Sequence, residues 1–157
     1  MARRNQPEDT TTFKYYNANP KNRVTTDCVN RAVCTALNED YATVLREMCE
    51  VQIKTGYDNA CNQGISKYME EKGWVKKLQP RKADGTKYTG EEFCNMLKKH
   101  PIVLGIHPDF YSTERILANI GGHHIVAIVD GKVNDIWDST SGCIGNIWVE
   151  PIRQGGL

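Results

Sequence analysis

Cys28 opens a segment with helical periodicity, and that position could make its thiol reactive. Thr25, Thr26 or Asp27 can supply the oxygen that caps this helix. The free backbone N–H groups and the positive end of the helix dipole favour a thiolate there, and they can also bind an oxyanion. The alternative is a small core cysteine, since one helical face is apolar: Val29, Ala32, Val33, Ala36 and Leu37.

A histidine and an aspartate flank a predicted β-hairpin near the end of the chain. A β-branched run leads from His124 to the turn-forming pair Asp130-Gly131, and a second strand follows as far as Asp138. A three-residue turn would put His124 directly opposite Asp138, so that the two side chains could hydrogen-bond. A two-residue turn would instead put Trp137 opposite His124, with Asp138 reaching in from the strand end. The sequence alone leaves both registers open.

The motifs around these residues resemble the papain-like cysteine peptidase superfamily, in particular its small, mostly uncharacterised phage and bacterial members. The resemblance rests on Asp-Cys-Val-x-Arg-Ala at residues 27–32, on Gly-His-His-Ile-Val-Ala-Ile-Val-Asp-Gly at 122–131 and on Asp-Ile-Trp-Asp at 135–138. It covers about residues 22–37 and 122–139. The middle of the chain is similar only in its order of helices and strands.

The resemblance implies roles for four residues. Cys28 would be the nucleophile, His124 its base and Asp138 the group that orients the imidazole. Asn22, six residues before the nucleophile, would complete the oxyanion hole, where papain has a glutamine. The implied chemistry is acyl transfer: a thiolate attacks a carbonyl, the histidinium protonates the leaving group and water releases the acyl enzyme.

Other residues are weaker candidates for this chemistry. Cys34 lies well inside the helix, away from the free N–H groups and on the side away from the apolar stripe. His123 should face the opposite side of the strand from His124. No Gly-x-Ser-x-Gly motif frames a serine, and no two cysteines have the spacing of a structural zinc site. We therefore expect neither a metal nor a cofactor.

Length and charge predict one domain over residues 1–157, with residues 1–12 as a flexible arm. Twenty basic and nineteen acidic side chains give a net charge of +1, which favours neither nucleic acid nor membrane as a partner. The expected partner is a peptide or protein substrate, and the oligomeric state is open. A basic cluster without interleaved aromatics indicates a solvated surface: Lys76, Lys77, Arg81, Lys82 and Lys87.

The six cysteines are expected to be reduced. The N-terminus has no apolar leader, and no run approaches the ~20 apolar residues of a membrane span. A chain of this length can build a core without disulfides. We therefore expect a cytoplasmic protein, in the host cytoplasm if a phage encodes it, without a secretory signal peptide.

Periodicity predicts an α+β fold, papain-like, with N-terminal helices packed on a C-terminal antiparallel sheet. Residues 108–120 are predicted to form a long loop beside the site. Helices are expected at residues 28–37, from 41 onward, at 63–71 and at 90–100, and strands at 74–78, 102–106, 124–129, 133–138 and 144–149.

Two functions from different classes fit these observations. The first is a papain-like cysteine hydrolase, a peptidase or isopeptidase, with amidase or acyltransferase use of the same residues also open. The second is a non-catalytic papain-like scaffold that acts as a binding or virion-associated phage protein. The presence of a cysteine, a histidine and an aspartate in the required order favours the enzyme.

Overall fold

Six strands form one mixed sheet in the computed structural model, which describes residues 5–100 and 104–152. The strands are β1 (Phe13–Tyr15), β2 (Val75–Lys77), β3 (Tyr111–Ile120), β4 (His124–Val129), β5 (Lys132–Asp135) and β6 (Ile144–Pro151). Their order across the sheet is β1-β5-β4-β3-β6-β2. The predicted α+β class is confirmed. The sheet is not purely antiparallel as predicted, because β1 pairs with β5 in parallel.

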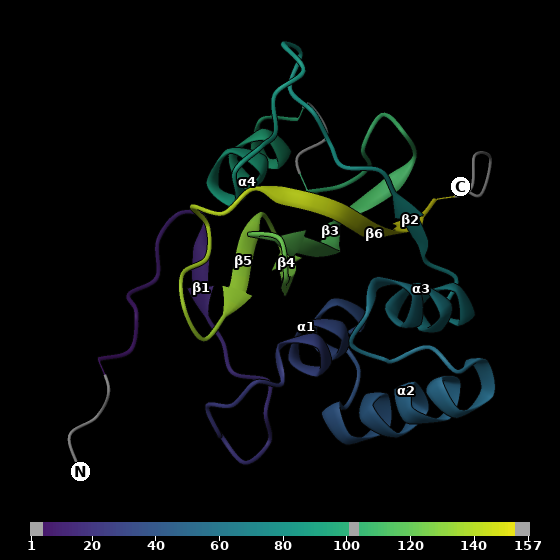
Figure 1. Cartoon of the computed structure of the whole chain (residues 1–157). Coiled ribbons are helices and arrows are strands. Elements are labelled where there is room, and N and C mark those ends of the chain that lie inside the picture. The colour runs from purple at the N-terminus through teal and green to yellow at the C-terminus, as the bar shows by residue number, and fades with distance from the viewer. Residues whose placement is uncertain (1–4, 101–103, 153–157) are drawn as a thin grey trace.

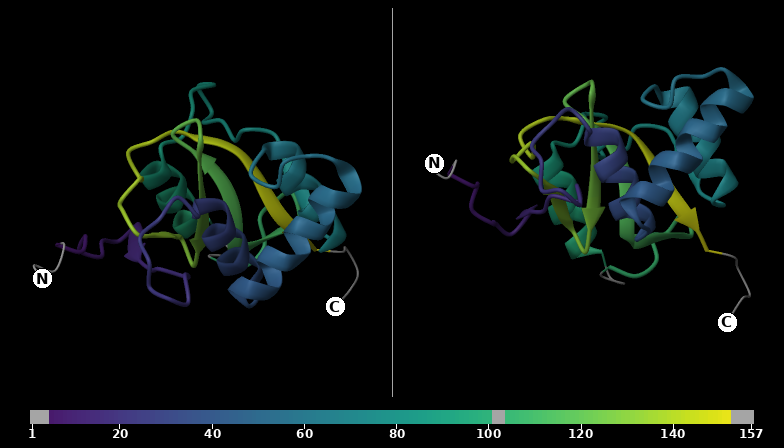
Figure 2. Two further views of the ribbon diagram at one scale, coloured as in Figure 1. Left: turned by 60° about the horizontal axis from the view of Figure 1, so that its bottom comes forward. Right: turned by 90° about the horizontal axis from the view of Figure 1, so that it is seen from below.

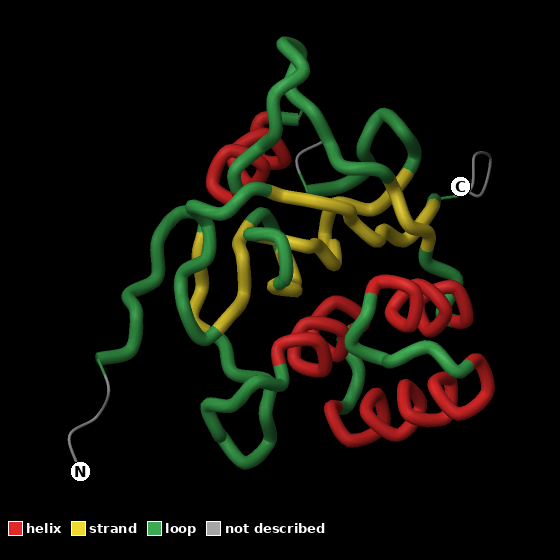
Figure 3. The backbone as a smooth tube through the Cα atoms, viewed as in Figure 1, coloured by secondary structure: helices red, strands yellow, loops and turns green. Residues whose placement is uncertain are grey.

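The four helices of the described residues lie on both faces of this sheet. They are α1 (Cys28–Leu37), α2 (Tyr41–Thr55), α3 (Asn62–Glu71) and α4 (Gly90–Lys99). Helices α1, α2 and α3 lie on one side of the strands and α4 on the other (Figures 1 and 3). The further views show α1 next to the sheet, where it packs on β4 and β3, with α2 outside it (Figure 2).

Alternating side chains of the strands build two apolar clusters, one on each face of the sheet. On β3 and β4, Leu117 and Ile125 face the layer of α1, α2 and α3, whereas Ile116 and Val126 face α4. Trp148 of β6 is fully buried in the first cluster, and its indole N–H donates to the hydroxyl of Ser66 (3.0 Å). The central strands are therefore covered on both faces, which fixes their register strongly.

Local signals in the sequence explain where the helices begin and end. Asp40 caps α2 by accepting the N–H of Thr43 (2.9 Å). Thr89 and Glu92 form a capping box at the start of α4. Gly56 ends α2 in the left-handed conformation, with a φ of 77°. The observed bounds lie within a residue or so of the predicted ones.

A two-residue turn joins β4 to β5. Asp130 and Gly131 both have positive φ, 50° and 71°, as a type I′ turn requires. Val129 consequently pairs with Lys132. Of the two registers that the sequence left open, this is the one that puts Trp137 at the position opposite His124.

Strand β3 lies where the sequence predicted a long loop. The prediction for residues 108–120 was wrong because polar side chains in the first half of the strand, Ser112, Glu114 and Arg115, hide its alternation. Residues 102–103 of the predicted strand at 102–106 lie outside the described residues. Within the rest of that segment, Leu104 and Gly105 form a turn, and only Ile106 makes an isolated bridge, to Ser112.

The second half of the predicted arm is tied to the sheet. The carbonyl of Thr12 accepts the N–H of Val133 (2.8 Å), and the carboxylate of Asp9 accepts the N–H of Tyr15 (2.8 Å). Residues 1–4 of the arm lie outside the described residues. No helix within residues 5–100 and 104–152 is both long enough and apolar enough to cross a membrane.

Replacing Gly131 with alanine should destabilise the hairpin. A Cβ at this φ costs about 1–2 kcal/mol, and it would also meet Cε of Lys98 at 2.9 Å. Gly85 has a similar φ of 85° but nothing within 4 Å of the added atom, so Gly85→Ala is the matched control. Urea unfolding should show a larger loss of free energy for Gly131→Ala than for Gly85→Ala. An equal loss would mean that the environment of this turn adds nothing to the backbone strain.

Candidate active site

The thiol of Cys28 lies at the N-terminus of α1, half-buried beside the sheet. The first helical hydrogen bond runs from the N–H of Arg31 to the carbonyl of Asp27 (3.0 Å). The N–H groups of residues 28–30 therefore have no acceptor within the helix. These N–H groups lie at the positive end of the helix dipole, so they can stabilise negative charge near the sulfur.

His124, the first residue of β4, contacts this thiol. The hydrogen bond from the imidazole lowers the pKa of Cys28 and outweighs the opposing effect of partial burial; the backbone N–H of Ile125 lowers the pKa further. Burial lowers the pKa of His124, but bonds to Asp135 and Cys28 outweigh it and raise this pKa to about 9. Both shifts favour a thiolate beside an imidazolium at neutral pH.

Asp135, not Asp138, is the carboxylate that holds the imidazole. Its Oδ2 bonds to Nε2 of His124, and its side chain is only 2% exposed. Asp138 instead accepts the N–H (3.0 Å) and the hydroxyl (2.6 Å) of Thr140. The structure therefore brings together Cys28 and His124 as predicted, but the carboxylate that bonds to the imidazole is that of Asp135 and not that of Asp138.

The hairpin register explains this correction. With Val129 paired to Lys132, counting outward puts residue 137 opposite His124, and the ring of Trp137 lies 4.9 Å from the imidazole, centroid to centroid. Asp135 comes two residues before Trp137 and so shares its face of the hairpin, diagonally across from His124. Asp138 would have faced His124 only with one more residue in the turn.

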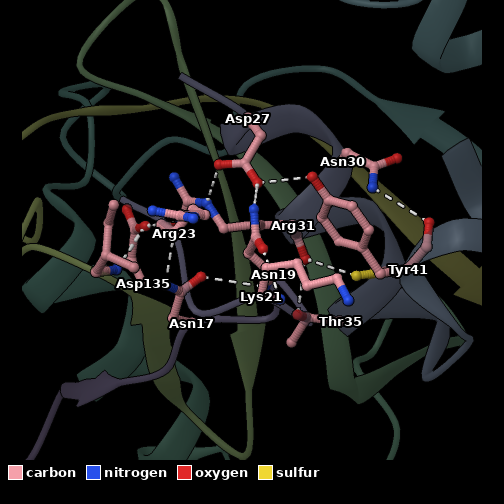
Figure 4. A network of polar contacts seen from close by, with 12 residues as sticks. Asn17, Asn19, Lys21, Arg23, Asp27, Asn30, Arg31, Thr35, Tyr41 and Asp135 are labelled. Carbon is pink, nitrogen blue, oxygen red and sulfur yellow. Dashed lines mark hydrogen bonds and ion pairs between the residues drawn. The ribbon is translucent and has the colours of Figure 1, made fainter. Parts of the chain in front are cut away.

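Arg31 links Asp135 to a second carboxylate, that of Asp27, which immediately precedes α1. Its Nη1 lies 2.7 Å from Oδ1 of Asp135 and its Nε 2.8 Å from Oδ1 of Asp27, as Figure 4 shows. The guanidinium is only 5% exposed. Burial raises the pKa of Asp135, but hydrogen bonds from His124 and Arg31 outweigh it and hold this pKa below its ordinary value. Asp135 therefore remains an anion, with its Oδ1 bonded to Arg31 and its Oδ2 bonded to His124.

Asp27 is held in turn from two other segments. Its Oδ2 accepts the hydroxyl of Tyr41 on α2 (2.7 Å) and the amide of Asn19 in the loop before α1 (3.0 Å) (Figure 4). Burial and the bond to Asp27 raise the pKa of Tyr41 to about 12, so this phenol stays a donor. Because its carboxylate is used in this way, Asp27 makes no side-chain cap to α1 although it occupies the N-cap position.

Asn22, which was predicted to complete the oxyanion hole, lies in the loop before α1. It is exposed in a turn with a φ of 53°, and its backbone N–H bonds to the carbonyl of Asn19 (2.9 Å). Among the described residues, no hydrogen bond joins Asn22 to Cys28. The groups that bond to the sulfur are the imidazole of His124 and the backbone N–H of Ile125.

All six cysteines are free thiols, and two of them are held protonated. Cys34 was predicted to lie away from the apolar side of α1, but it is 4% exposed and belongs to the core beneath the helix. Burial raises its pKa to about 11. Burial likewise raises the pKa of Cys94 to about 12. Cys28 is the cysteine whose surroundings lower its pKa.

Comparison with known proteins adds no relative: no family model, curated protein or solved structure matches the chain. Within the described residues, no group of three or more histidine, cysteine or acidic side chains could hold a metal ion. A functional assignment therefore rests on the geometry around Cys28.

Replacing Asp135 with asparagine should lower the pKa of His124 from about 9 toward its ordinary value of about 6.5, because the anionic partner is lost. Asp138→Asn is the matched control and should leave the titration of His124 unchanged. The pKa of the ring can be followed by the pH dependence of its NMR signals. A larger effect from Asp138→Asn would restore the original assignment.

Replacing Arg31 with methionine should cost about 3–5 kcal/mol of unfolding free energy, since it leaves two partly or fully buried carboxylates without their cation. Arg46 is exposed on α2, so Arg46→Met should change stability by less than about 0.5 kcal/mol. Adding Asp135→Asn to Arg31→Met should recover part of the loss. A cost below about 1 kcal/mol for Arg31→Met would show that the bridge contributes little.

Proposed function

We propose that the protein is a cysteine hydrolase of the papain-like type, a peptidase or isopeptidase with Cys28, His124 and Asp135 as its triad. One observation carries the proposal. A thiol at a helix N-terminus contacts an imidazole, and a buried carboxylate binds the other side of that ring. This is the arrangement of nucleophile, base and orienting group that acyl transfer requires.

The papain-like assignment is supported by chain order as well as by the triad. The cysteine opens a helix that packs on β4, and the histidine and the aspartate follow on β4 and on the adjacent β5. Two residues of the Asp-Cys-Val-x-Arg-Ala motif also have a structural role. Asp27 and Arg31, one helical turn apart, connect the helix that carries the nucleophile to Asp135.

The first half of the reaction uses the thiolate and imidazolium directly. The sulfur of Cys28 adds to the substrate carbonyl carbon, and the negative charge that develops on the oxygen is stabilised by free N–H groups at the start of α1. The imidazolium of His124 then gives its proton to the leaving nitrogen as the carbon–nitrogen bond breaks. A thioester on Cys28, a free amine and a neutral imidazole result.

The second half returns the site to its starting state. The neutral imidazole takes a proton from water, whose oxygen adds to the thioester carbon. The carbon–sulfur bond then breaks, so that the acid product leaves and the thiolate again faces an imidazolium. Asp135 keeps the ring oriented through both halves, and Arg31 keeps Asp135 in place and charged.

The proposal predicts selective reactivity of Cys28. Brief treatment with iodoacetamide near pH 6 should label Cys28 ahead of the other five cysteines, because its pKa is lowered whereas burial raises those of Cys34 and Cys94. His124→Ala should move this labelling to higher pH by removing the imidazolium. His123→Ala is the matched control, since His123 is the exposed neighbour, and it should change the labelling little. Peptide mapping by mass spectrometry gives the labelled position.

Turnover separates the hydrolase from a non-catalytic scaffold. A mixture of unstructured peptides should acquire new termini when incubated with the protein, and Cys28→Ala should abolish them. Slow, uniform labelling of all six cysteines, unaffected by His124→Ala and accompanied by no cleavage, would exclude the hydrolase and favour the scaffold.

A further inference from the structure

A second pocket, of about 460 Å³, lies on the face of the sheet that α4 covers. Met96 of α4 and Ile147 of β6 line it, and both belong to the apolar cluster on that face. Figure 1 shows the segment between β2 and α4 on the same side of the sheet, and this segment forms another part of the wall. Helix α1, which begins at Cys28, packs on the opposite face. The pocket is therefore separate from the candidate active site, and its volume is typical of small-molecule sites.

This pocket brings aromatic rings to the basic cluster that the sequence contains. Lys77 and Arg81 of that cluster line the pocket, together with the rings of Tyr88, His107 and Tyr111. The sequence indicated a solvated surface, because aromatic residues do not alternate with the basic ones. His107 and Tyr111 come from a distant part of the chain and reach the cluster only in the folded protein. Cations next to aromatic rings are typical of sites that bind nucleotides and single-stranded nucleic acid.

Lys77 and Arg81 bring positive charge that no ion pair neutralises. Within residues 5–100 and 104–152, neither side chain pairs with a carboxylate, whereas the neighbouring Lys82 pairs with Glu92. Arg81 uses only Nη1, which donates to the carbonyl of Gly85 (3.2 Å). The remaining N–H groups of its guanidinium can therefore bind an anion from solution.

The aromatic part of the lining is flat and uncharged. The ring of Tyr88 meets that of Phe93 edge to face (centroids 5.7 Å apart, planes at 62°), so Phe93 covers at most one face of the Tyr88 ring. His107 stacks on Tyr111 (4.4 Å, 13°). Burial lowers the pKa of His107 and outweighs the opposing effect of Asp109, so this imidazole is neutral at pH 7. The pocket thus has an apolar surface for a planar ring next to two cations.

Asp109 gives the same pocket one hydrogen-bond acceptor with a full charge. Its carboxylate is 69% exposed, and its Oδ2 lies 3.6 Å from Nδ1 of His107, beyond ordinary hydrogen-bond distance. Since the imidazole is neutral, this contact leaves the carboxylate free to accept an N–H from a ligand. A ligand that fits the pocket therefore combines an anionic group, a planar ring and an N–H donor.

We propose that this pocket binds one nucleotide, with its phosphate at Lys77 and Arg81 and its base against Tyr88. A nucleotide has the three features that the lining calls for: an anion, a planar ring and ring or amino N–H groups that Asp109 can accept. Inorganic phosphate would leave the rings uncovered, and a nucleoside would leave the cations unpaired. A free nucleotide and a nucleotide within a single strand share this chemistry. The site does not depend on the proposed hydrolase.

Isothermal titration calorimetry on the full chain tests this site. The probes are the 5′-monophosphates of adenosine, guanosine, cytidine and uridine, the corresponding nucleosides, and inorganic phosphate. At least one monophosphate should bind at a single site per chain. Its nucleoside and inorganic phosphate should each bind about tenfold more weakly or worse, because each lacks one of the two sets of contacts. A short single strand of the same base distinguishes the sources: tighter binding than the monophosphate identifies a strand, and equal or weaker binding identifies the free nucleotide.

Substitutions connect the binding to the pocket. Lys77→Met and Arg81→Met should each weaken binding of the monophosphate about tenfold and leave binding of the nucleoside unchanged. Lys87 belongs to the same basic cluster but does not line this pocket, so Lys87→Met is the matched control and should bind as the unmodified chain does. Tyr88→Leu should weaken binding of the nucleoside and the monophosphate alike, whereas Tyr88→Phe, which keeps the ring, should not. Arg81 and Lys87 are exposed, so this pair tests the site even if Tyr88→Leu does not fold.

Three results would overturn the proposal. The first is that none of the four monophosphates binds at about 1 mM, the weak limit of such sites. The second is that inorganic phosphate binds as tightly as the monophosphates, which would identify an anion site without a place for a base. The third is that Lys87→Met weakens binding as much as Arg81→Met, which would assign the effect to the charge of the whole cluster and not to the pocket.

Discussion

The buried ion pair between Arg31 and Asp135 is the constraint on which the site depends. It joins the helix that begins at Cys28 to the strand that ends at Asp135, with 2.7 Å between Nη1 of Arg31 and Oδ1 of Asp135. A carboxylate that is 2% exposed would favour its neutral form without compensation. Arg31 supplies that compensation, and Asp27 with Tyr41 and Asn19 keeps Arg31 from turning away. The charges of Cys28 and His124 thus depend on residues of α1, of α2 and of the loop before α1.

Most of the fold could be predicted from local signals in the sequence. The apolar stripe after Cys28, the capping residues Asp40 and Thr89, and the Asp130-Gly131 turn all determine structure through near neighbours in the chain, and these elements were found. Strand β3 was missed because its first half carries polar side chains. Its place in the centre of the sheet is set by distant partners in β4 and β6, which single-sequence patterns do not record.

The site was predicted in part for the same reason. Cys28 and His124 were found because the start of a helix and the start of a strand are local features. The partner of His124 depends on register, and one residue in the turn decides between Asp135 and Asp138. The Asp-Gly pair is itself typical of a two-residue turn, and it therefore favours the observed register. Asn22 was assigned from its offset alone, which says nothing about where a loop turns.

The two-residue turn has a consequence for how related sequences should be compared. In a hairpin of this kind, the position opposite the histidine is found by counting outward from the turn, and the acidic partner lies two residues before that position. Its place in a sequence alignment does not identify it. A homologue with one inserted turn residue could keep the same chemistry by moving its carboxylate along the chain. Motif searches that fix the spacing between histidine and aspartate would overlook it, although its atoms would occupy the same places.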